Sequence, residues 1–300
     1  MTTFTNDGSS GLRTDHPRGE ILSPTGEHIA IPEYAPAEPP RRRERSGWNP
    51  MGSPATYALT GINLAVFVVM VLRHVSPTSP DSNDLVRWGA NLGWADYAGA
   101  TANGAFRGEW WRLITATFEH VGALHLATNM WCLWNLGLLG EPLLGPWGLV
   151  ATYILTGVAG NLLSTAMHPV IVGAGASGAV FGIAGILIVL LSNKKLPIPW
   201  PELKKLRRSV IWFAILNLVL GVGLGSGLLS SIRIDNFAHI GGCLCGLALG
   251  LPLLPRMTSG RVKYLARQKV VFPVGALVLA LAGYWLSSFT AGVDPTKFLR

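Results

Sequence analysis

Seven apolar stretches of 15 to 20 residues follow one another after position 54, and they constrain the fold of this chain most strongly. A hydrocarbon core about 30 Å thick is crossed by about 20 apolar residues in a helix. Only helices and closed barrels can span it, and these stretches lack the ten-residue alternation of barrel strands. The sequence therefore predicts an all-α, polytopic membrane helical bundle. The expected spans are 55–72, 124–140, 148–167, 177–191, 210–225, 237–254 and 270–289.

The charge pattern agrees with a membrane protein. Only 13% of the 300 residues are charged, about half the share of a soluble domain, and the mean hydropathy is +0.38. The net charge of +8 comes from basic clusters beside the apolar stretches, at 41–45, 194–208 and 256–269. This is how membrane proteins distribute cytoplasmic charge. No soluble domain remains to carry a basic face, so no nucleic-acid partner is expected.

The three basic clusters also predict an orientation. With the first cluster inside, seven spans place the other two on the same side. We therefore expect an integral multi-pass protein of a bacterial cell membrane, with a cytoplasmic N-terminus and an outer C-terminus. Residues 1–50 are expected to be a disordered cytoplasmic tail, and 51–256 a six-helix core. Residues 257–300 would hold a basic cytoplasmic linker, a seventh transmembrane helix and a short outer tail.

A few polar residues interrupt the apolar stretches, and such residues in a membrane tend to be functional. His125 and Asn129 lie at the start of the second span, Ser177 at the start of the fourth and His239 at the start of the sixth. These three spans run in the same direction. The topology therefore predicts that the four side chains lie at one depth, in the outer leaflet.

Each of these residues has a chemical role available to it. Gly175 and Gly178 flank the Ser177 region at a loop-to-helix junction, where glycine lets backbone approach closely. The helix N-terminus leaves amide N–H groups that can stabilise an oxyanion. A serine hydroxyl needs a nearby base to act as a nucleophile, and His239 is a candidate. His125 and Asn129 are four residues apart on one helix face and could donate to a developing negative charge.

Glycines also predict which spans approach one another. Gly178 and Gly182 form a small-xxx-small pair in the fourth span, and Gly242, Gly246 and Gly250 continue that spacing in the sixth. Such ridges let membrane helices pack backbone to backbone. Phe181 lies one turn after Ser177, so we expect its ring to stack against His239.

Each feature also has a purely structural interpretation. The glycines could serve packing alone, an intramembrane histidine could be a packing or proton-relay residue, and His125 with Asn129 could bond neighbouring helices. The shared depth and the glycine ridges together favour a catalytic site. The cysteines, Cys132, Cys243 and Cys245, lie inside spans and suggest neither a disulfide nor a metal site.

Four motifs in order resemble one family, the rhomboid intramembrane serine proteases. They are Glu109-Trp110-Trp111-Arg112, the segment 118–130 (FEHVGALHLATNM), the segment 173–182 (GAGASGAVFG) and Ala238-His239-Ile240-Gly241-Gly242. The resemblance covers about residues 51–254, and the last span resembles the family's six-plus-one arrangement.

The resemblance implies a serine endopeptidase with a Ser-His dyad and no cofactor or metal. Ser177 would be the nucleophile and His239 the general base and then acid. His125, Asn129 and the Ser177 backbone N–H would form the oxyanion hole. Substrates would be transmembrane segments of other proteins, cut near the outer leaflet within the lipid bilayer.

The resemblance also implies structural roles for the first loop and Glu141, and the sequence departs from the family pattern at Phe181. The first loop, with Trp111 and Arg112, would lie partly in the outer leaflet, and Glu141 would be structural near the cytoplasmic end of the second span. Phe181 stands where many family members have tyrosine, which keeps the stacking surface and removes a hydroxyl.

Other functions compete with proteolysis by a serine dyad. A catalytically inactive rhomboid-like binder or chaperone is the main alternative, although the retained Ser177 and His239 argue against it. A transporter is less favoured, because no acidic residue lies deep in any span. A zinc protease would need an H-E-x-x-H string, which does not occur here.

Overall fold

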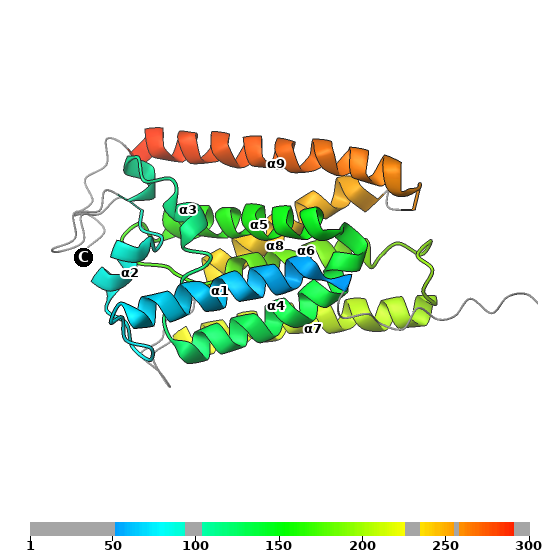
Figure 1. Ribbon diagram of the computed structural model, residues 1–300. Coiled ribbons are helices and arrows are strands. Elements are labelled where there is room, and N and C mark those ends of the chain that lie inside the picture. The colour runs from blue at the N-terminus through cyan, green and yellow to red at the C-terminus, as the bar shows by residue number, and fades with distance from the viewer. Residues whose placement is uncertain (1–51, 94–103, 226–234, 255–257, 291–300) are drawn as a thin grey trace, which may run out of the picture. The chain divides into compact units, whose positions relative to one another are not determined.

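The computed structural model describes residues 52–93, 104–225, 235–254 and 258–290, and all regular structure in these ranges is helical. Figure 1 shows the arrangement. The elements are α1 (Pro54–Leu72), α2 (Ser82–Trp88), the short 3-10 helix η2 (Ala105–Arg107), α3 (Arg112–Thr115), α4 (Ala123–Leu144), α5 (Pro146–Met167), α6 (Ser177–Leu190), α7 (Trp200–Gly225), α8 (Asn236–Leu253) and α9 (Arg261–Thr290). The predicted all-α fold is therefore confirmed.

Each of the seven expected spans coincides with a helix. Four of them, α1, α5, α8 and α9, are individually long and apolar enough to cross a membrane, and α6 is apolar but has only 14 residues. Two helices begin about three turns before the expected apolar stretch, α7 at Trp200 and α9 at Arg261. Lysine, arginine and leucine are good helix formers, so the basic segments continue these helices.

The chain divides into two units, 1–48 and 49–300. The helices belong to the second unit. The predicted disordered tail at 1–50 lies outside the described residues, as do the ends of the predicted linker and outer tail.

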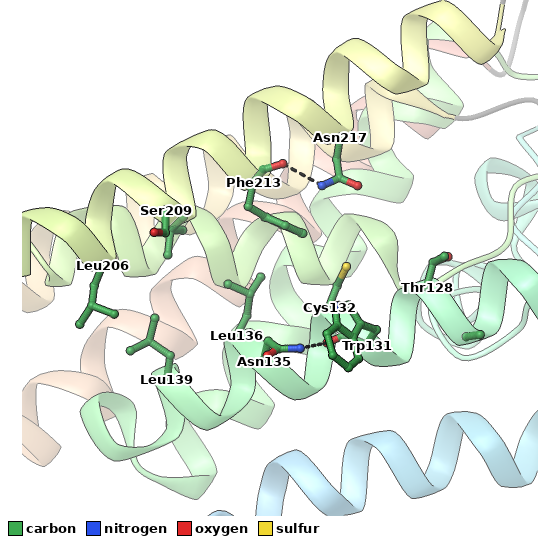
Figure 2. A pocket seen from close by; sticks show the side chains of 12 residues that line it. Thr128, Trp131, Cys132, Asn135, Leu136, Leu139, Leu206, Ser209, Phe213 and Asn217 are labelled. Carbon is green, nitrogen blue, oxygen red and sulfur yellow. Dashed lines mark hydrogen bonds between the residues drawn. The ribbon is translucent and has the colours of Figure 1, made fainter. Parts of the chain in front are cut away.

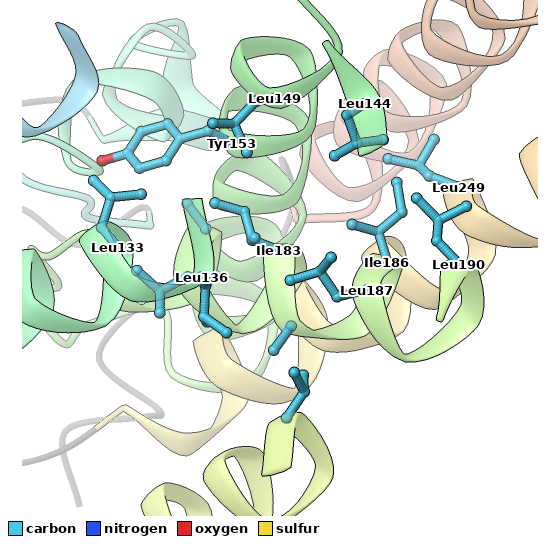
Figure 3. Close-up of a cluster of buried hydrophobic side chains, with 14 of the residues drawn as sticks. Leu133, Leu136, Leu144, Leu149, Tyr153, Ile183, Ile186, Leu187, Leu190 and Leu249 are labelled. Carbon is cyan, nitrogen blue, oxygen red and sulfur yellow. The ribbon is translucent and has the colours of Figure 1, made fainter. Parts of the chain in front are cut away.

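Helix α6 forms the centre of the second unit. Every residue from Gly178 to Leu187 is buried. Helices α4, α5, α7 and α8 pack around it. Figure 3 shows Ile183 and Leu187 of α6 in one buried cluster with Leu133 of α4 and Leu149 of α5. Helix α9 packs against α5 and α8 and leaves most of its own surface exposed.

Glycines set the closest helix contacts, as the ridges predict. A Cβ on Gly242 would collide with the carbonyl oxygen of Gly178, and a Cβ on Gly246 would collide with that of Gly182. Helices α6 and α8 therefore meet backbone to backbone. The structure adds a third helix to this contact, because a Cβ on Gly160 of α5 would lie 2.6 Å from the carbonyl oxygen of Ala238.

Arg112 of the first loop and Glu141 both make buried structural hydrogen bonds. Glu141 is 2% exposed and accepts hydrogen bonds from the first turn of α1, at 2.9 Å from the Ala55 N–H and 2.8 Å from the Thr56 N–H. These donors have no partner within their own helix. In the loop, the buried Arg112 binds Glu109 at 2.6 Å and donates to the carbonyl of Val86 at 2.7 Å.

Candidate active site

The loop before α6 is held in place by the first loop and positions Ser177. Gly173 and Asn91 exchange backbone hydrogen bonds of 2.8 and 2.9 Å, and the Gly175 N–H donates to the Ala116 carbonyl at 2.9 Å. Gly175 has a φ of +147°, which favours glycine. Ser177 follows as the first, half-buried residue of α6. The N–H groups of this first turn are therefore available to a ligand.

His239 lies in the first turn of α8 and is 5% exposed. Its ring stacks on Phe181, with centroids 4.2 Å apart and planes within 9° of parallel. This confirms the stacking that the sequence predicts. Asp235 caps α8 by accepting from the Ala238 N–H at 3.0 Å, and it also accepts from the Ser164 hydroxyl. The nearest acid in sequence is thus engaged in holding the helix start.

The contacts bring the starts of α6 and α8 together. Phe181 is one turn after Ser177 and shares its helix face, and its ring covers His239. A Cβ on Gly178 would lie 3.3 Å from the carbonyl oxygen of Ala238. The residues next to Ser177 and His239 therefore touch, and the face that carries Ser177 is turned toward His239.

Helix α4 adds the third helix start. A Cβ on Gly175 would lie 2.6 Å from Cε1 of His125, so the imidazole rests directly against the loop that precedes Ser177. Asn129 is 6% exposed and its Nδ2 donates to the His125 carbonyl at 2.9 Å. That nitrogen carries two hydrogens, so one remains for another acceptor. All four predicted residues thus gather where α4, α6 and α8 begin.

Several supporting residues escape the sequence analysis. Asn91 donates through Nδ2 to the Asn161 carbonyl at 3.1 Å and to the Thr165 hydroxyl at 2.7 Å. Asn161 in turn donates to the Leu113 carbonyl at 2.9 Å. These bonds fasten the first loop to α5. The polar Asn161 within an apolar stretch was a signal available in the sequence, whereas Asn91 lies in a loop and gave none.

Two titratable residues are buried just before α4. Glu119 is 2% exposed and His120 is fully buried. Burial raises the pKa of Glu119 to about 8 against the opposing effect of Arg112, and burial with the nearby His125 lowers the pKa of His120 to about 3. The His120 and His125 ring centroids are 5.4 Å apart. His120 lies in the loop just before α4, and its ring packs behind the His125 ring.

A cavity of about 630 Å³ opens between α4 and α7 (Figure 2). Its walls include Trp131, Cys132 and Leu136 from α4, and Leu206 and Phe213 from α7. Most of the wall is apolar, with Thr128, Asn135, Ser209 and Asn217 as its polar residues. An apolar concave site with a few polar groups is typical of a binding cleft.

The family model described as Rhomboid domain matches residues 107–256, which is half of the chain. The chain therefore belongs to the rhomboid family and is an integral membrane protein. The matched range contains all four predicted site residues.

The chain is also similar to individual rhomboid proteins. It is 38% identical over 151 residues to the rhomboid protease GluP of Bacillus subtilis (strain 168), covering 49% of this chain and 27% of that protein. It is 35% identical over 190 residues to the mitochondrial RHOMBOID-like protein 6 of Arabidopsis thaliana, covering 58% of each. It is 29% identical over 217 residues to the rhomboid protease AarA of Providencia stuartii, covering 65% and 71%. The chain thus spans about a quarter of GluP and somewhat over half of the plant relative.

Proposed function

We propose that this protein is an intramembrane serine endopeptidase with Ser177 as nucleophile and His239 as its base. The observation that carries the proposal is the stack of His239 on Phe181, one turn after Ser177, at the glycine contact of α6 and α8. The names of the bacterial relatives GluP and AarA, both rhomboid proteases, support it.

The proposed chemistry proceeds in two steps. His239 takes the proton of the Ser177 hydroxyl while Oγ attacks the scissile carbonyl, and the tetrahedral intermediate expels the amine, which receives the proton from His239. Water, activated by His239, then hydrolyses the acyl-enzyme. His125, Asn129 and the Ser177 N–H are proposed to stabilise the oxyanion. The Phe181 ring orients His239, so the reaction does not need a carboxylate as a third catalytic residue.

The proposed substrates are transmembrane segments of other membrane proteins, cut near the outer leaflet. A helix hides its carbonyl groups in its own hydrogen bonds, so the substrate must unwind locally at the cleaved bond. The apolar cavity between α4 and α7 is the proposed route by which such a segment reaches Ser177 from the lipid. Because the substrate must unwind at the cleaved bond, helix-breaking residues near that bond should increase the cleavage rate.

Orientation and membrane are part of the proposal. The basic residues of the α6–α7 and α8–α9 junctions support a cytoplasmic N-terminus and an outer C-terminus. A bacterial cell membrane is proposed because GluP and AarA are bacterial, although the relatives also include a plant protein named as mitochondrial.

The test is cleavage of a single-span reporter by the purified full chain, in detergent and in lipid, beside Ser177→Ala and His239→Ala. We expect the wild type to cut, and both variants to fail with an unchanged melting temperature. A fluorophosphonate probe, which reports an activated serine without a substrate, should label the wild type and not Ser177→Ala. Wild-type protein that neither cuts several reporters nor takes the probe would overturn the proposal in favour of a membrane-protein binder.

A further inference from the structure

Three cationic side chains surround one indole ring where α6 passes into α7. The Nζ atoms of Lys194 and Lys204 lie 5.2 and 5.4 Å from the Trp200 ring centroid, and Cζ of Arg207 lies 5.7 Å from it. These distances are within the range of cation–π interactions. We name these four residues the Trp200 cluster. It lies outside the candidate active site, and nothing in the proposed proteolysis uses it.

The fold fixes the ring before any ligand binds. A turn after α6 is closed by bonds from the Leu196 N–H to the Asn193 carbonyl at 3.2 Å and from the Lys195 N–H to Asn193 Oδ1 at 3.0 Å. The chain then enters α7 at Trp200, whose partly buried ring packs against the main hydrophobic core. The three cations therefore meet at a place that the core has built.

Within the ranges that the structure describes, no acidic side chain forms an ion pair with the cluster. Among the described residues the ion pairs are Arg87–Asp84 and Arg112–Glu109, both remote in sequence. Lys194 and Lys204 are exposed, and Arg207 donates to the Ser192 hydroxyl at 3.0 Å. Between positions 194 and 208 the chain has six lysines and arginines and one carboxylate, Glu202. Like charges gathered around a fixed ring create a site for an anion.

The position of the cluster identifies the anion. It lies at the end of one membrane helix and the beginning of the next, where tryptophan and basic residues typically meet the headgroup region. The anion that this region supplies is a lipid phosphate, and basic clusters next to membrane helices bind anionic lipids. We propose that the Trp200 cluster binds the phosphate headgroup of an anionic phospholipid, with the cations on the phosphate and the indole beside its glycerol.

The test counts lipids retained by the purified full chain. Delipidated protein in mild detergent is mixed with phosphatidylglycerol or phosphatidylcholine, and native mass spectrometry measures retention while thermal melting measures stabilisation. We expect several-fold preferential retention of phosphatidylglycerol, which falls as salt is raised. The triple variant Lys194→Gln/Lys204→Gln/Arg207→Gln should lose most of this preference. Trp200→Leu, which keeps every charge, should weaken it.

The matched control removes three positive charges elsewhere. Arg261→Gln/Lys263→Gln/Lys269→Gln changes exposed residues of α9 by the same total charge, and it should keep the preference. The double variant Lys194→Gln/Lys204→Gln, which preserves the Arg207–Ser192 bond, guards against misfolding of the triple variant. The proposal is overturned if the cluster variants retain phosphatidylglycerol, or if both triple variants lose it equally. It is also overturned if inorganic phosphate at the same concentration stabilises the protein as well as the lipid does.

Discussion

At the scale of single residues, Glu119 is a carboxyl group that the loop before α4 holds almost out of water. Its pKa of about 8 exceeds the ordinary value of 4.5, so between these pH values the folded protein binds a proton that the unfolded chain has released. The free energy of unfolding therefore decreases as the pH rises through this window and levels off above about 8. His120, whose pKa falls from 6.5 to about 3, acts oppositely and destabilises the fold as the pH falls below 6.5.

Glu119→Gln should remove the decrease in stability that the wild type shows between about pH 4.5 and pH 8. We expect the melting temperature of the variant to exceed that of the wild type by an amount that grows from pH 5 to pH 8 and then stays constant. Thermal melting in detergent at pH 5 to 9 measures it. Glu202→Gln, at an exposed carboxylate, is the control and should follow the wild type. Parallel curves for the wild type and Glu119→Gln would contradict the prediction.

Phe181 offers a second prediction at this scale. Its ring is the surface on which His239 lies, and aromatic pairs contribute about 0.5–1.5 kcal/mol beyond their buried area, which corresponds to roughly 2- to 12-fold in rate. We expect Phe181→Leu to lower kcat/KM for a membrane reporter by such a factor, and Phe181→Tyr to stay close to the wild type. Equal activity of Phe181→Leu and wild type would show that the stack does not orient the imidazole.

The site residues that the sequence predicts share a helical spacing. Ser177, Phe181 and the glycine ridges follow the helical period, so their common face can be read from spacing alone. The contact of His125 with Gly175 and the bonds of Asn91 to α5 join segments far apart in the chain. No local period encodes such contacts, which is why they required the structure.

At the scale of elements, the contact of α6 with α8 depends on a missing side chain. A Cβ on Gly242 would have to displace the backbone of α6 at Gly178, and overpacking of this kind destabilises by about 1–3 kcal/mol. We expect Gly242→Ala to lower the melting temperature and the reporter cleavage together. Gly61→Ala on the exposed side of α1, where an added Cβ meets nothing within 4 Å, is the matched control. It should lower neither quantity, since alanine is the better helix former. An unchanged Gly242→Ala protein would argue against close packing here.

The long helices could be predicted from the sequence, whereas the short helices of the first loop could not. The apolar stretches predicted the seven long helices, because burial in lipid dictates both their length and their composition. Helices α2 and α3 of the first loop were not predicted, since their 7 and 4 residues are too few to show a period. Their positions depend on Arg112, which binds the carbonyls of Val86 and Ala90.

At the scale of the whole molecule, the proposed route to the site requires α4 and α7 to separate. Asn135 and Ser209 both line the cavity between these helices. In a chain with Cys132, Cys243 and Cys245 replaced by alanine, a reducible linker joining Asn135→Cys to Ser209→Cys should stop cleavage of a membrane reporter. Reduction should restore it, and each single cysteine variant treated with the linker should stay active. Cleavage that persists after complete cross-linking would sink the proposed route.

The shortness of α6 also bears on how the chain enters the bilayer. Its 14 residues extend about 21 Å at 1.5 Å each, less than the roughly 30 Å of hydrocarbon that a free helix has to bridge. Alone in lipid, α6 would not reach both surfaces of the bilayer, so the backbone groups at one of its ends would lie in hydrocarbon without water to bond to. Helix α8, which covers it along its glycine ridge, is synthesised only after α7. Helices α4 and α5, which precede α6 in the chain, can cover part of its surface, but its glycine ridge stays uncovered until α8 has been made. The surroundings of Ser177 are therefore complete only after α8 has been synthesised.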